Sequence, residues 1–527
     1  MNKLKCSLNT FLIFILVMGL GGCGRLVDRG YPGYLPNIII ILADDLGYSD
    51  LSCYGSEKIN TPNLDKMASD GMAFTNFWTT CNVCSPSRAS LLTGRYPQRC
   101  GVPFALGGVY SDLGLQDDEI TIAELLKDKG YSTAAIGKWH LGIPLGFNYT
   151  THQGFNSSSE FHPNNQGFDL FFGAVGNAFP DGRIPLIENE IVVDDSVTVA
   201  TVTDHYNSRA IEFIKENKEN PFFIYFAHTR PHAPWTPNPR FDGTSDGGVY
   251  GDMVEELDAS VGEVIAVLKD LELDEKTLVI FTSDNGAAIT EDQRYGSNLP
   301  FRGGKGTTWD GGHRVPGIFY WPGKIAAGEV SNQMATVMDL LPTIKNMAGA
   351  ELPDDRVIDG YNIWPLLSGD DKTEQPGQSF YYYNGFNLQA IRDGKWKLHL
   401  PREEKMLVWW ESGLRDLKDP LLFNLDNDSS ESINVADENP QVVNRLLDQA
   451  QKVRNELGSW DIPGTGQKDI ERLLNDRTTL RILRSHQDHQ NLGVSKLDTT
   501  TPEINLYYWE IAKENRRKKL EELSEKN

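Results

Sequence analysis

Carboxylates, histidines and lysines that could form a hydrolytic site recur at four places along the 527-residue chain. Each place directly follows a short apolar run that is typical of a strand. The residues are Asp44 and Asp45, Lys138 and His140, His228 and His232, and Asp284 and Asn285. Either acidic pair alone is more often a turn or a cap, but two pairs at separate strand ends favour a metal. Carboxylate and amide oxygens suit calcium or magnesium rather than zinc.

A fifth candidate is the segment C-S-P-S-R-A-S-L-L-T-G, which runs from Cys84 to Gly94. Ser85 is typical of an N-cap, Pro86 of the first helical position and Gly94 of the residue that ends a helix. We therefore expect Cys84 to lie just before a helix whose amino end favours anions, with Arg88 adding positive charge. A capped helix with a buried cysteine would explain Pro86 and Gly94, but not Arg88 beside the four other clusters.

The elements around these residues predict an α/β fold with a large mixed, mostly parallel sheet that is sandwiched by helices. The clearest strands are residues 38–42, 133–136, 222–226, 278–281 and 317–320. Helical patterns lie at 121–129 and 251–271. Because ligands bind beyond the carboxyl ends of strands in open α/β sheets, we expect the polar clusters to converge on one crevice.

A polar linker at residues 367–379 predicts a domain boundary, with a catalytic domain at 36–370 and a smaller C-terminal α+β domain at 376–527. Four β-like stretches and one amphipathic helix predict a small antiparallel sheet covered by a helix, followed by a charged helical tail. They are residues 380–383, 390–392, 395–400 and 421–425 for the strands, 441–457 for the helix and 504–527 for the tail.

The amino terminus is typical of an export signal. Lys3 and Lys5 precede an apolar run to Leu20 that is too short to span a membrane, which predicts a signal peptide at residues 1–22. The sequence L-G-G-C ending at Cys23 resembles a bacterial lipobox, so we expect an exported lipoprotein, periplasmic or at the cell surface, that is held to the membrane through a lipid on Cys23. The alternative is ordinary secretory cleavage with Cys23 incidental.

The other cysteines argue against a zinc site. Cys81 and Cys84 could form a redox or half-zinc pair, but no second pair completes a zinc site. If Cys84 serves another purpose, the remaining Cys53, Cys81 and Cys100 allow at most one disulfide.

The net charge of the chain is −23, which argues against nucleic acid as a partner. It also requires any anionic substrate to be captured by a locally positive pocket.

The segment C-S-P-S-R-A-S-L-L-T-G-R resembles the signature of the type I sulfatases of the alkaline phosphatase superfamily, in which the cysteine is oxidised after translation to formylglycine. The motifs LADD, GKWHLG, TSDNGAA and GGKGTTWDGG occur in family order within residues 36–322, and LFNLDND continues the resemblance weakly into the C-terminal domain. The resemblance implies an alkaline-phosphatase-like fold, a sulfuric ester hydrolase and a formylglycine-generating maturation enzyme as a partner.

The resemblance also assigns roles. It places a divalent cation, usually calcium with magnesium as the alternative, among Asp44, Asp45, Asp284, Asn285 and the modified residue 84. Arg88 and the cation would hold the formylglycine hydrate, and Lys138 and Lys305 would bind the sulfate oxygens. His140 would act as the base that releases sulfate, and His232 would protonate the leaving oxygen, with His228 as the competing candidate. A satisfied structural residue is the alternative for each histidine, and a flexible surface loop is the alternative for Lys305.

Within the family, EFHPNNQGFDLFFG, RPHAPW and GSNLPFRGGKGTT look most like N-acetylgalactosamine-6-sulfatase and arylsulfatase A. This suggests a sulfated glycan substrate, with a 6-O-sulfate on galactose or N-acetylgalactosamine. Asn177 is a candidate for a polar position that has no clear match. His152, His162 and Asn165 could contact sugar, although exposed loop residues are more often solvated. His313 and Arg314 are expected to be structural, and the glycines around Lys305 suggest close approach to a ligand.

The sequence leaves two alternative functions open. A phosphate-ester hydrolase of the same superfamily would share the metal ligands but typically place Ser or Thr at position 84. A catalytically silent glycan-binding lipoprotein should have lost at least one catalytic residue, and all are present. These are Cys84, Arg88, Lys138, His140, His232 and Lys305.

Overall fold

The computed structural model describes residues 34–106, 114–142, 160–179, 181–289, 295–369, 379–403, 416–459 and 462–468. The predicted signal peptide, Cys23, His152 and the tail at 504–527 lie outside these residues. The same holds for most of the predicted linker, so the domain bounds stay predictions. No helix in the described part of the chain is long and apolar enough to cross a membrane.

The larger sheet has eleven strands among the described residues, in the order β10-β2-β9-β8-β1-β7-β3-β4-β5-β6, with β11 beside β2. Its strands are β1 (Asn37–Ala43), β2 (Met72–Trp78), β3 (Ser132–Lys138), β4 (Leu170–Ala174), β5 (Leu186–Glu188), β6 (Ile191–Asp194), β7 (Phe222–Ala227), β8 (Thr277–Ser283), β9 (Arg314–Tyr320), β10 (Glu329–Ser331) and β11 (Ala335–Thr336). The stretch β8-β1-β7-β3-β4 is parallel, whereas β9 runs antiparallel to β8 and β2. The predicted mixed, mostly parallel sheet is confirmed.

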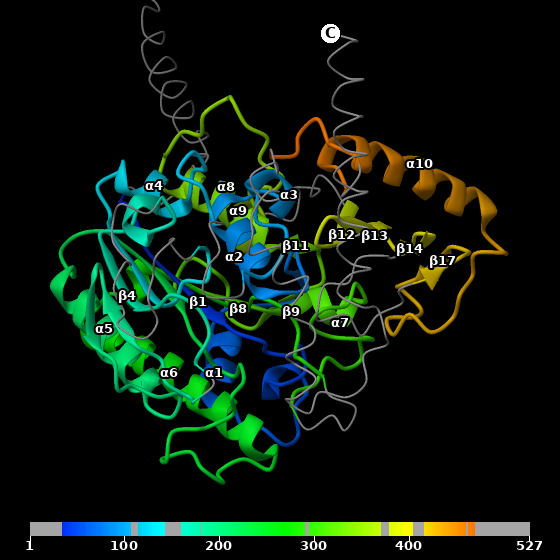
Figure 1. The fold of residues 1–527 in the computed structure, drawn as a ribbon. Coiled ribbons are helices and arrows are strands. Elements are labelled where there is room, and N and C mark those ends of the chain that lie inside the picture. The colour runs from blue at the N-terminus through cyan, green and yellow to red at the C-terminus, as the bar shows by residue number, and fades with distance from the viewer. Residues whose placement is uncertain are drawn as a thin grey trace, which may run out of the picture. The chain divides into compact units, whose positions relative to one another are not determined.

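Helices cover both faces of this sheet (Figure 1). The helices α1 (Pro62–Ser69), α5 (Val202–Glu216) and α6 (Gly248–Asp270) lie on one face, and α2 (Cys84–Thr93), α4 (Ile122–Lys127) and α8 (Leu340–Met347) lie on the other. Every residue of β1 and β8 is buried, as expected for strands covered on both sides. Short helices complete this part: α3 (Pro97–Cys100), α7 (Asp310–His313), α9 (Trp364–Leu367), and the 3-10 turns η1 (Ser52–Tyr54), η2 (Pro163–Gln166), η3 (Asp274–Lys276) and η4 (Val337–Asp339).

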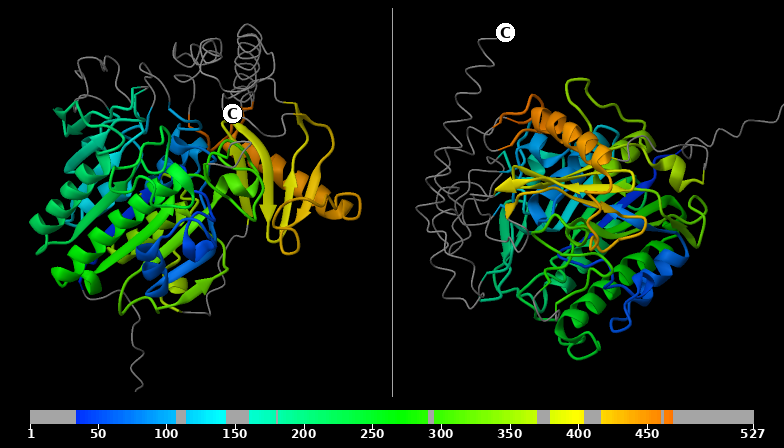
Figure 2. Two further views of the ribbon diagram at one scale, coloured as in Figure 1. Left: turned by 90° about the horizontal axis from the view of Figure 1, so that it is seen from below. Right: turned by 90° about the vertical axis from the view of Figure 1, so that its right-hand side faces the viewer.

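A second sheet is antiparallel and has the order β12-β13-β14-β17. Its elements are β12 (Ser379–Asn384), β13 (Asn387–Asp393), β14 (Trp396–His399) and β17 (Leu421–Asn424), and a separate pair is formed by β15 (Arg402–Glu403) and β16 (Asp416–Leu417). Helix α10 (Pro440–Leu457) packs apolar side chains onto β13 and β14, and it lies along one face of the sheet in Figure 2. The predicted sheet covered by a helix is therefore confirmed, and both sheets belong to one compact unit from Pro36 onwards.

Candidate active site

Four neighbouring strands of the large sheet end at the predicted polar residues. β8, β1, β7 and β3 are consecutive and parallel. Backbone pairing continues past their ends: the N–H of Asp44 donates to the carbonyl of Arg230 at 2.8 Å, and the N–H of Asp284 donates to the carbonyl of Ala43 at 3.1 Å. The clusters therefore meet at one edge of the sheet, where open α/β sheets bind their ligands.

Helix α2 begins at Cys84 itself, two residues earlier than the sequence pattern predicts. Ser85 is not the N-cap; its hydroxyl instead accepts a hydrogen bond from the N–H of Leu106 at 3.0 Å. Pro86 is tolerated inside the first turn because the first four N–H groups of a helix have no partner within it. Gly94 ends the helix with a φ of 67°, as predicted.

The Cys84 thiol lies against the two carboxylates that follow β1. Its Sγ is 3.5 Å from Asp44 Oδ1 and 4.0 Å from Asp45 Oδ1. Burial, followed by the charge of Asp284, raises the pKa of the Cys84 thiol. The unmodified sulfur therefore stays protonated and is a weak nucleophile.

Arg88 is fully buried one turn after Cys84. Its Nε and Nη2 donate to Asp284 Oδ2 at 2.9 and 2.7 Å, and its Nη1 donates to the carbonyl of Lys138 at 2.8 Å. Arg88 thus ties α2 to the ends of β8 and β3. Charge-assisted bonds of this kind are strong and hold both partners in one geometry.

The two predicted sulfate-binding lysines each contact one carboxylate. Lys138 Nζ is 2.7 Å from Asp44 Oδ2, and Lys305 Nζ is 2.7 Å from either oxygen of Asp45. With Arg88 and Asp284, three cationic side chains face three carboxylates, so the formal charge of the site is balanced. An anion therefore meets a local charge very different from the −23 of the whole chain.

These contacts shift the ionisation of the carboxylates and amines. Burial alone would raise the pKa of Asp44. Lys138, followed by His232 and Arg88, outweighs burial and holds the pKa of Asp44 well below its ordinary value. Burial alone would lower the pKa of Lys305, but Asp45 outweighs it and raises that pKa, so Lys305 stays charged.

The donor set of the site fits a divalent cation. Asn285 Nδ2 donates to Asp45 Oδ1 at 2.7 Å, whereas its Oδ1 is buried and has no hydrogen-bond partner within the described ranges. Ligand atoms of Asp44, Asp45, Cys84 and His232 lie within 4.8 Å of one another. Asp284 is not in this group, and its oxygens accept from Arg88 and from the N–H of Asp45. Buried carboxylates and an orphaned amide oxygen suit a hard cation.

His140 is buried and keeps one ring nitrogen available. Its Nε2 lies 2.7 Å from the carbonyl of Leu106, while Nδ1 has no hydrogen-bond partner among the residues described. Burial, followed by the charges of Lys138 and Arg88, lowers the pKa of His140 well below its ordinary value. His140 is therefore neutral and can accept a proton at Nδ1.

His232 and His228 follow the same strand but lie in different surroundings. His232 Nε2 is 3.6 Å from Asp45 Oδ2, and burial followed by Lys305 lowers the pKa of His232. His228 is fully buried, with Nε2 at 3.2 Å from Ser260 Oγ on α6. This placement fits His232 better than His228 as the residue that reaches a substrate.

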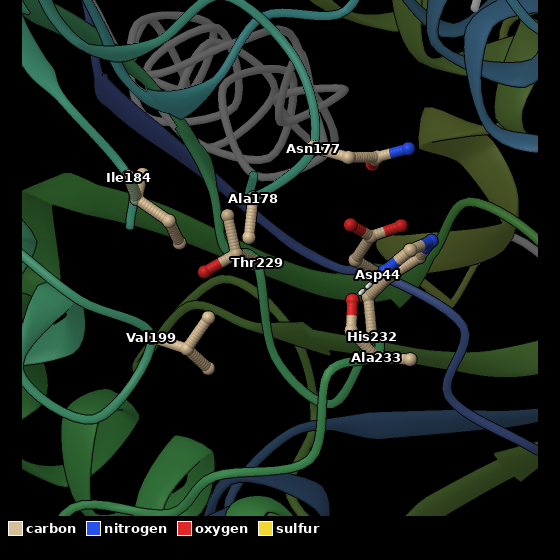
Figure 3. Close-up of a pocket in the computed structure, with 8 residues that line it drawn as sticks. All are labelled: Asp44, Asn177, Ala178, Ile184, Val199, Thr229, His232 and Ala233. Carbon is tan, nitrogen blue, oxygen red and sulfur yellow. Dashed lines mark hydrogen bonds between the residues drawn. The ribbon is translucent and has the colours of Figure 1, made fainter. Parts of the chain in front are cut away.

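A small pocket opens beside Asp44 and His232, and Asn177 lines it as well (Figure 3). In that view the side chain of Asn177 extends on the same side of the pocket as Asp44 and His232. Five lining residues are not predicted from the sequence: Ala178, Ile184, Val199, Thr229 and Ala233. Thr229 could have been found, because it comes two residues after β7, whereas Ile184 and Val199 belong to irregular segments without a pattern.

The structure does not bring His162 to this pocket. His162 is fully buried, its Nε2 lies 2.9 Å from the carbonyl of Asn189, and its Nδ1 accepts from the N–H of Asn164 at 3.2 Å. The predicted contact between His162 and the substrate is therefore wrong, because both ring nitrogens of His162 already hydrogen-bond to the backbone. Asn165 is exposed in the same turn.

Two further expectations concern residues near Lys305. His313 and Arg314 are structural as expected, with His313 Nδ1 at 3.1 Å from the carbonyl of Thr79 and Arg314 donating to the carbonyl of Thr75. Gly304 does allow a close approach, but to the protein itself: a Cβ there would lie 2.4 Å from the carbonyl oxygen of Ala287.

The cysteines in the described part of the chain are all free thiols. They are Cys53, Cys81, Cys84 and Cys100. Cys53 is exposed and the others are buried. The single disulfide that the cysteine count allows is not formed among them.

The chain is similar to known sulfatases in sequence and in structure. The family model Sulfatase matches residues 36–350, and that of the C-terminal region of aryl-sulfatase matches residues 375–463. The chain is 40% identical to N-acetylgalactosamine-6-sulfatase of Canis lupus familiaris over 73% of this chain and 74% of the relative, and 38% identical to human arylsulfatase A over 80% and 88%. A crystal structure of Ps i-CgsB in complex with k-i-k-neocarrahexaose superposes with a TM-score of 0.68 and 30% identity, covering 80% of this chain and 92% of that one. The chain therefore belongs to the sulfatase family and is a sulfuric ester hydrolase.

Proposed function

We propose that this sulfatase removes an O-sulfate group from a sulfated carbohydrate, with 6-O-sulfated galactose or N-acetylgalactosamine in a glycan as the substrate. One observation carries the proposal. Cys84 opens helix α2 with its Sγ 3.5 Å from Asp44 Oδ1, inside a ring of three carboxylates and three cationic side chains. This is the position from which a modified residue 84 can meet an anionic sulfate ester.

The nucleophile is formylglycine made from Cys84. A maturation enzyme oxidises the Cβ–S carbon by two electrons with an external oxidant, adds the oxygen of water and releases sulfur as sulfide. Water then adds to the aldehyde to give a hydrate. An unmodified Cys84 would be a weak nucleophile here, because burial raises the pKa of its thiol.

Asp44, Asp45, Asp284 and Asn285 would hold a divalent cation, calcium or magnesium. When bound, the cation supplies positive charge that polarises the hydrate and the sulfate oxygens. Lys138 and Lys305 bind the sulfate oxygens and stabilise the charge that develops on them. Arg88 holds the carboxylate of Asp284 and the carbonyl of Lys138 in place.

Two histidines move the protons. One hydroxyl of the hydrate gives its proton to a carboxylate of the site and attacks sulfur. The bond from sulfur to the sugar oxygen breaks, and His232, protonated when substrate is bound, donates its proton to that oxygen. His140 then takes the proton of the second hydroxyl at Nδ1, the C–O bond to the sulfate breaks, and the aldehyde is restored. The lowered pKa of His232 favours its neutral form in the free enzyme, and the charge of an incoming sulfate counteracts Lys305 and raises that pKa.

The proposed substrate class rests on the similarity of this chain to known sulfatases. A relative with 40% identity is named N-acetylgalactosamine-6-sulfatase, and Ps i-CgsB was solved with an oligosaccharide. Asn177 lines the pocket beside Asp44 and His232 and is the proposed sugar contact. We also propose that the enzyme is exported and held to the membrane by a lipid on Cys23.

The test is sulfate release from a panel of monosulfated galactose, N-acetylgalactosamine, glucosamine and fucose. The protein is co-produced with a formylglycine-generating enzyme, and the mass of the residue-84 peptide confirms the aldehyde. Preferential release from a 6-sulfated galacto-configured sugar is expected. Release from another sugar alone would overturn the substrate but not the mechanism.

Cys84→Ala is the matched control for this panel. The small side chain removes the nucleophile and leaves the charged ring in place, so sulfate release should be lost while the melting temperature stays close to that of the parent. Sulfate release by Cys84→Ala would eliminate the formylglycine mechanism.

A further inference from the structure

A second group of buried charges lies between the catalytic part and the C-terminal sheet. Lys397 Nζ on β14 is 2.7 Å from Asp310 Oδ1 and 2.9 Å from Glu431 Oε2, and the side chains of all three residues are fully buried. His399 Nε2 lies 2.9 Å from Glu431 Oε2, and Tyr382 donates to Asp310 Oδ1 at 3.1 Å. None of these residues takes part in the mechanism above.

The group holds the segment of residues 302–310, which carries Lys305. The N–H of Asp310 donates to Glu431 Oε1 at 2.7 Å, and Arg302 Nη1 donates to the carbonyl of Glu431 at 3.1 Å. Thr308 Oγ1 donates to Gln389 Oε1 on β13 at 2.7 Å. Between these two ends, Lys305 faces the active site, where its Nζ lies 2.7 Å from Asp45. The segment is therefore fastened to the C-terminal sheet on one side and reaches the site on the other.

Aromatic contacts also hold the segment of residues 302–310 against the C-terminal sheet. The Trp309 ring lies 4.2 Å from the ring of His399 and 5.9 Å from that of Phe423, measured between centroids, and the guanidinium of Arg302 lies 3.9 Å from the Trp309 centroid. Lys397 Nζ lies 4.0 Å above the Tyr382 ring. These contacts fix the direction from which the segment returns to Lys305.

Buried ion pairs often add little to stability, since an apolar replacement of similar volume is frequently neutral or stabilising. They do enforce one arrangement, because any shift that parts the charges leaves one of them buried and unpaired. Glu431 also holds a left-handed backbone conformation, with φ of 51°, although it is fully buried. Such strain persists only where the surroundings impose it.

We propose that Lys397 of the C-terminal sheet and Glu431 of the loop after β17, acting through Asp310, are positioning residues for the sulfate-binding Lys305. The C-terminal sheet thereby completes the active site without touching the substrate. This inference rests on the proposed role of Lys305.

The test is a double-mutant cycle on the formylglycine-containing enzyme. One variant combines Lys397→Met, Asp310→Asn and Glu431→Gln, which removes every charge while keeping volume, and it is made both in the parent and in a Lys305→Met background. We expect kcat/KM for the sulfated sugar to fall about 10- to 100-fold in the parent background, because a displacement of about 1 Å can cost about 100-fold. In the Lys305→Met background the further loss should be below about 3-fold, since residues that act as a unit are not additive.

A second, milder double variant tests the same proposal if the charge-free variant fails to fold. Thr308→Val with Gln389→Leu replaces both partners of one hydrogen bond by apolar groups of similar shape, which is often nearly neutral for stability. A several-fold loss of kcat/KM that disappears in the Lys305→Met background is expected here as well. Arg445→Met with Asp393→Asn is the control, because this ion pair joins α10 and β13 at the surface, and its kcat/KM should stay at the parent value.

The outcomes separate the two proposals. Equal losses in the two backgrounds, or full kcat/KM in the folded charge-free variant, would overturn the positioning role alone. A Lys305→Met variant with parental kcat/KM would overturn the sulfate-binding role of Lys305 and this inference with it. No sulfate release by parent enzyme that carries the aldehyde would instead remove the proposed function.

Discussion

Asp45 and His140 both hold left-handed backbone conformations, with φ of 67° and 56°. Residues other than glycine meet a cost of roughly 1–2 kcal/mol in this conformation. Neither residue lies in a surface turn: Asp45 follows β1 against Lys305, and His140 follows β3 with its ring buried. The chain accepts this strain at the places where a carboxylate and a base must face the same crevice.

The Nδ1 of His140, which has no hydrogen-bond partner in the described part of the chain, leads to a prediction about the second chemical step. His140→Gln keeps a donor for the carbonyl of Leu106 but removes the base. We expect turnover to fall by about 10²- to 10⁴-fold, since this is the usual contribution of a general base. The first step should survive, so one alcohol should be released per active site in a rapid burst.

Mass spectrometry of the residue-84 peptide measures this directly. A sulfated adduct should accumulate in His140→Gln and not in the parent enzyme. Slow turnover without burst or adduct would show that His140 does not act after the first step.

Asn285 Oδ1, which no described residue hydrogen-bonds, and the neighbouring carboxylates lead to a prediction about cations. Burial, followed by the charge of Asp44, raises the pKa of Asp284 to about 6, even though Arg88 opposes the shift. A divalent cation would relieve this repulsion. A ligand that binds only the folded state stabilises it by about 2.7 kcal/mol at 100 times its Kd.

Removal of divalent cations with a chelator should therefore lower both the melting temperature and sulfatase activity, and calcium or magnesium should restore both. Asp284→Asn, which keeps shape but loses charge, should need a higher cation concentration for the same recovery. Identical melting curves with and without the chelator would count against a cation at this place.

At the scale of single residues, the sequence predicts the charged members of the site because each follows an apolar strand or opens a helix. His162 shows where this reasoning fails. A polar residue in a glycine-rich, polar segment carries no sign of whether its ring faces a substrate or bonds to the backbone, and here both nitrogens do the latter. Tertiary packing decides such cases.

At the scale of elements, α2 carries Cys84 at one end and Gly94 at the other. Gly94 has φ of 67°, and a Cβ there would lie 3.1 Å from the Cβ of Leu341 and 3.2 Å from the carbonyl oxygen of Met338. Gly94→Ala thus combines backbone strain with crowding. We expect the free energy of unfolding to fall by more than the roughly 1–2 kcal/mol of a left-handed alanine.

Gly130→Ala is the matched control, because its φ is 83° and no atom of the residues that the structure describes lies within 4 Å of the added Cβ. Urea unfolding of the two variants should show the larger loss for Gly94→Ala. Equal losses would mean that the end of α2 yields to the added methyl group.

The strand order illustrates what patterns along the chain can and cannot predict. Parallel strands covered on both faces appear as continuous apolar runs, so β1, β3, β7 and β8 were predicted with their polar ends. No such run marks β2, where buried and half-buried residues alternate at first, or the edge strands β10 and β11, which have three and two residues. The contact between β14 and the Lys305 segment likewise follows no pattern along the chain.

At the scale of the whole molecule, the predicted lipid on Cys23 determines where the enzyme works. In a bacterial host, the parent protein should sediment with membranes and be released by detergent. Cys23→Ser removes the thiol that would receive the lipid and should move sulfatase activity to the soluble fraction. An unchanged membrane-bound pool would contradict the lipoprotein assignment.

The net charge of −23 acts on every substrate before the site does. At long range it repels a sulfated glycan, while the balanced charges of the site act only at short range. Salt screens exposed charges over about 30 Å at 0.01 M and about 10 Å at 0.1 M, so moderate salt weakens the repulsion more than the contacts inside the pocket. We therefore expect kcat/KM to rise as sodium chloride increases from about 0.01 to 0.1 M, and to rise more steeply for a multiply sulfated oligosaccharide than for a monosulfated sugar. If kcat/KM instead falls from the lowest salt onwards, the cationic residues of the site extend their attraction beyond the pocket and outweigh the charge of the chain.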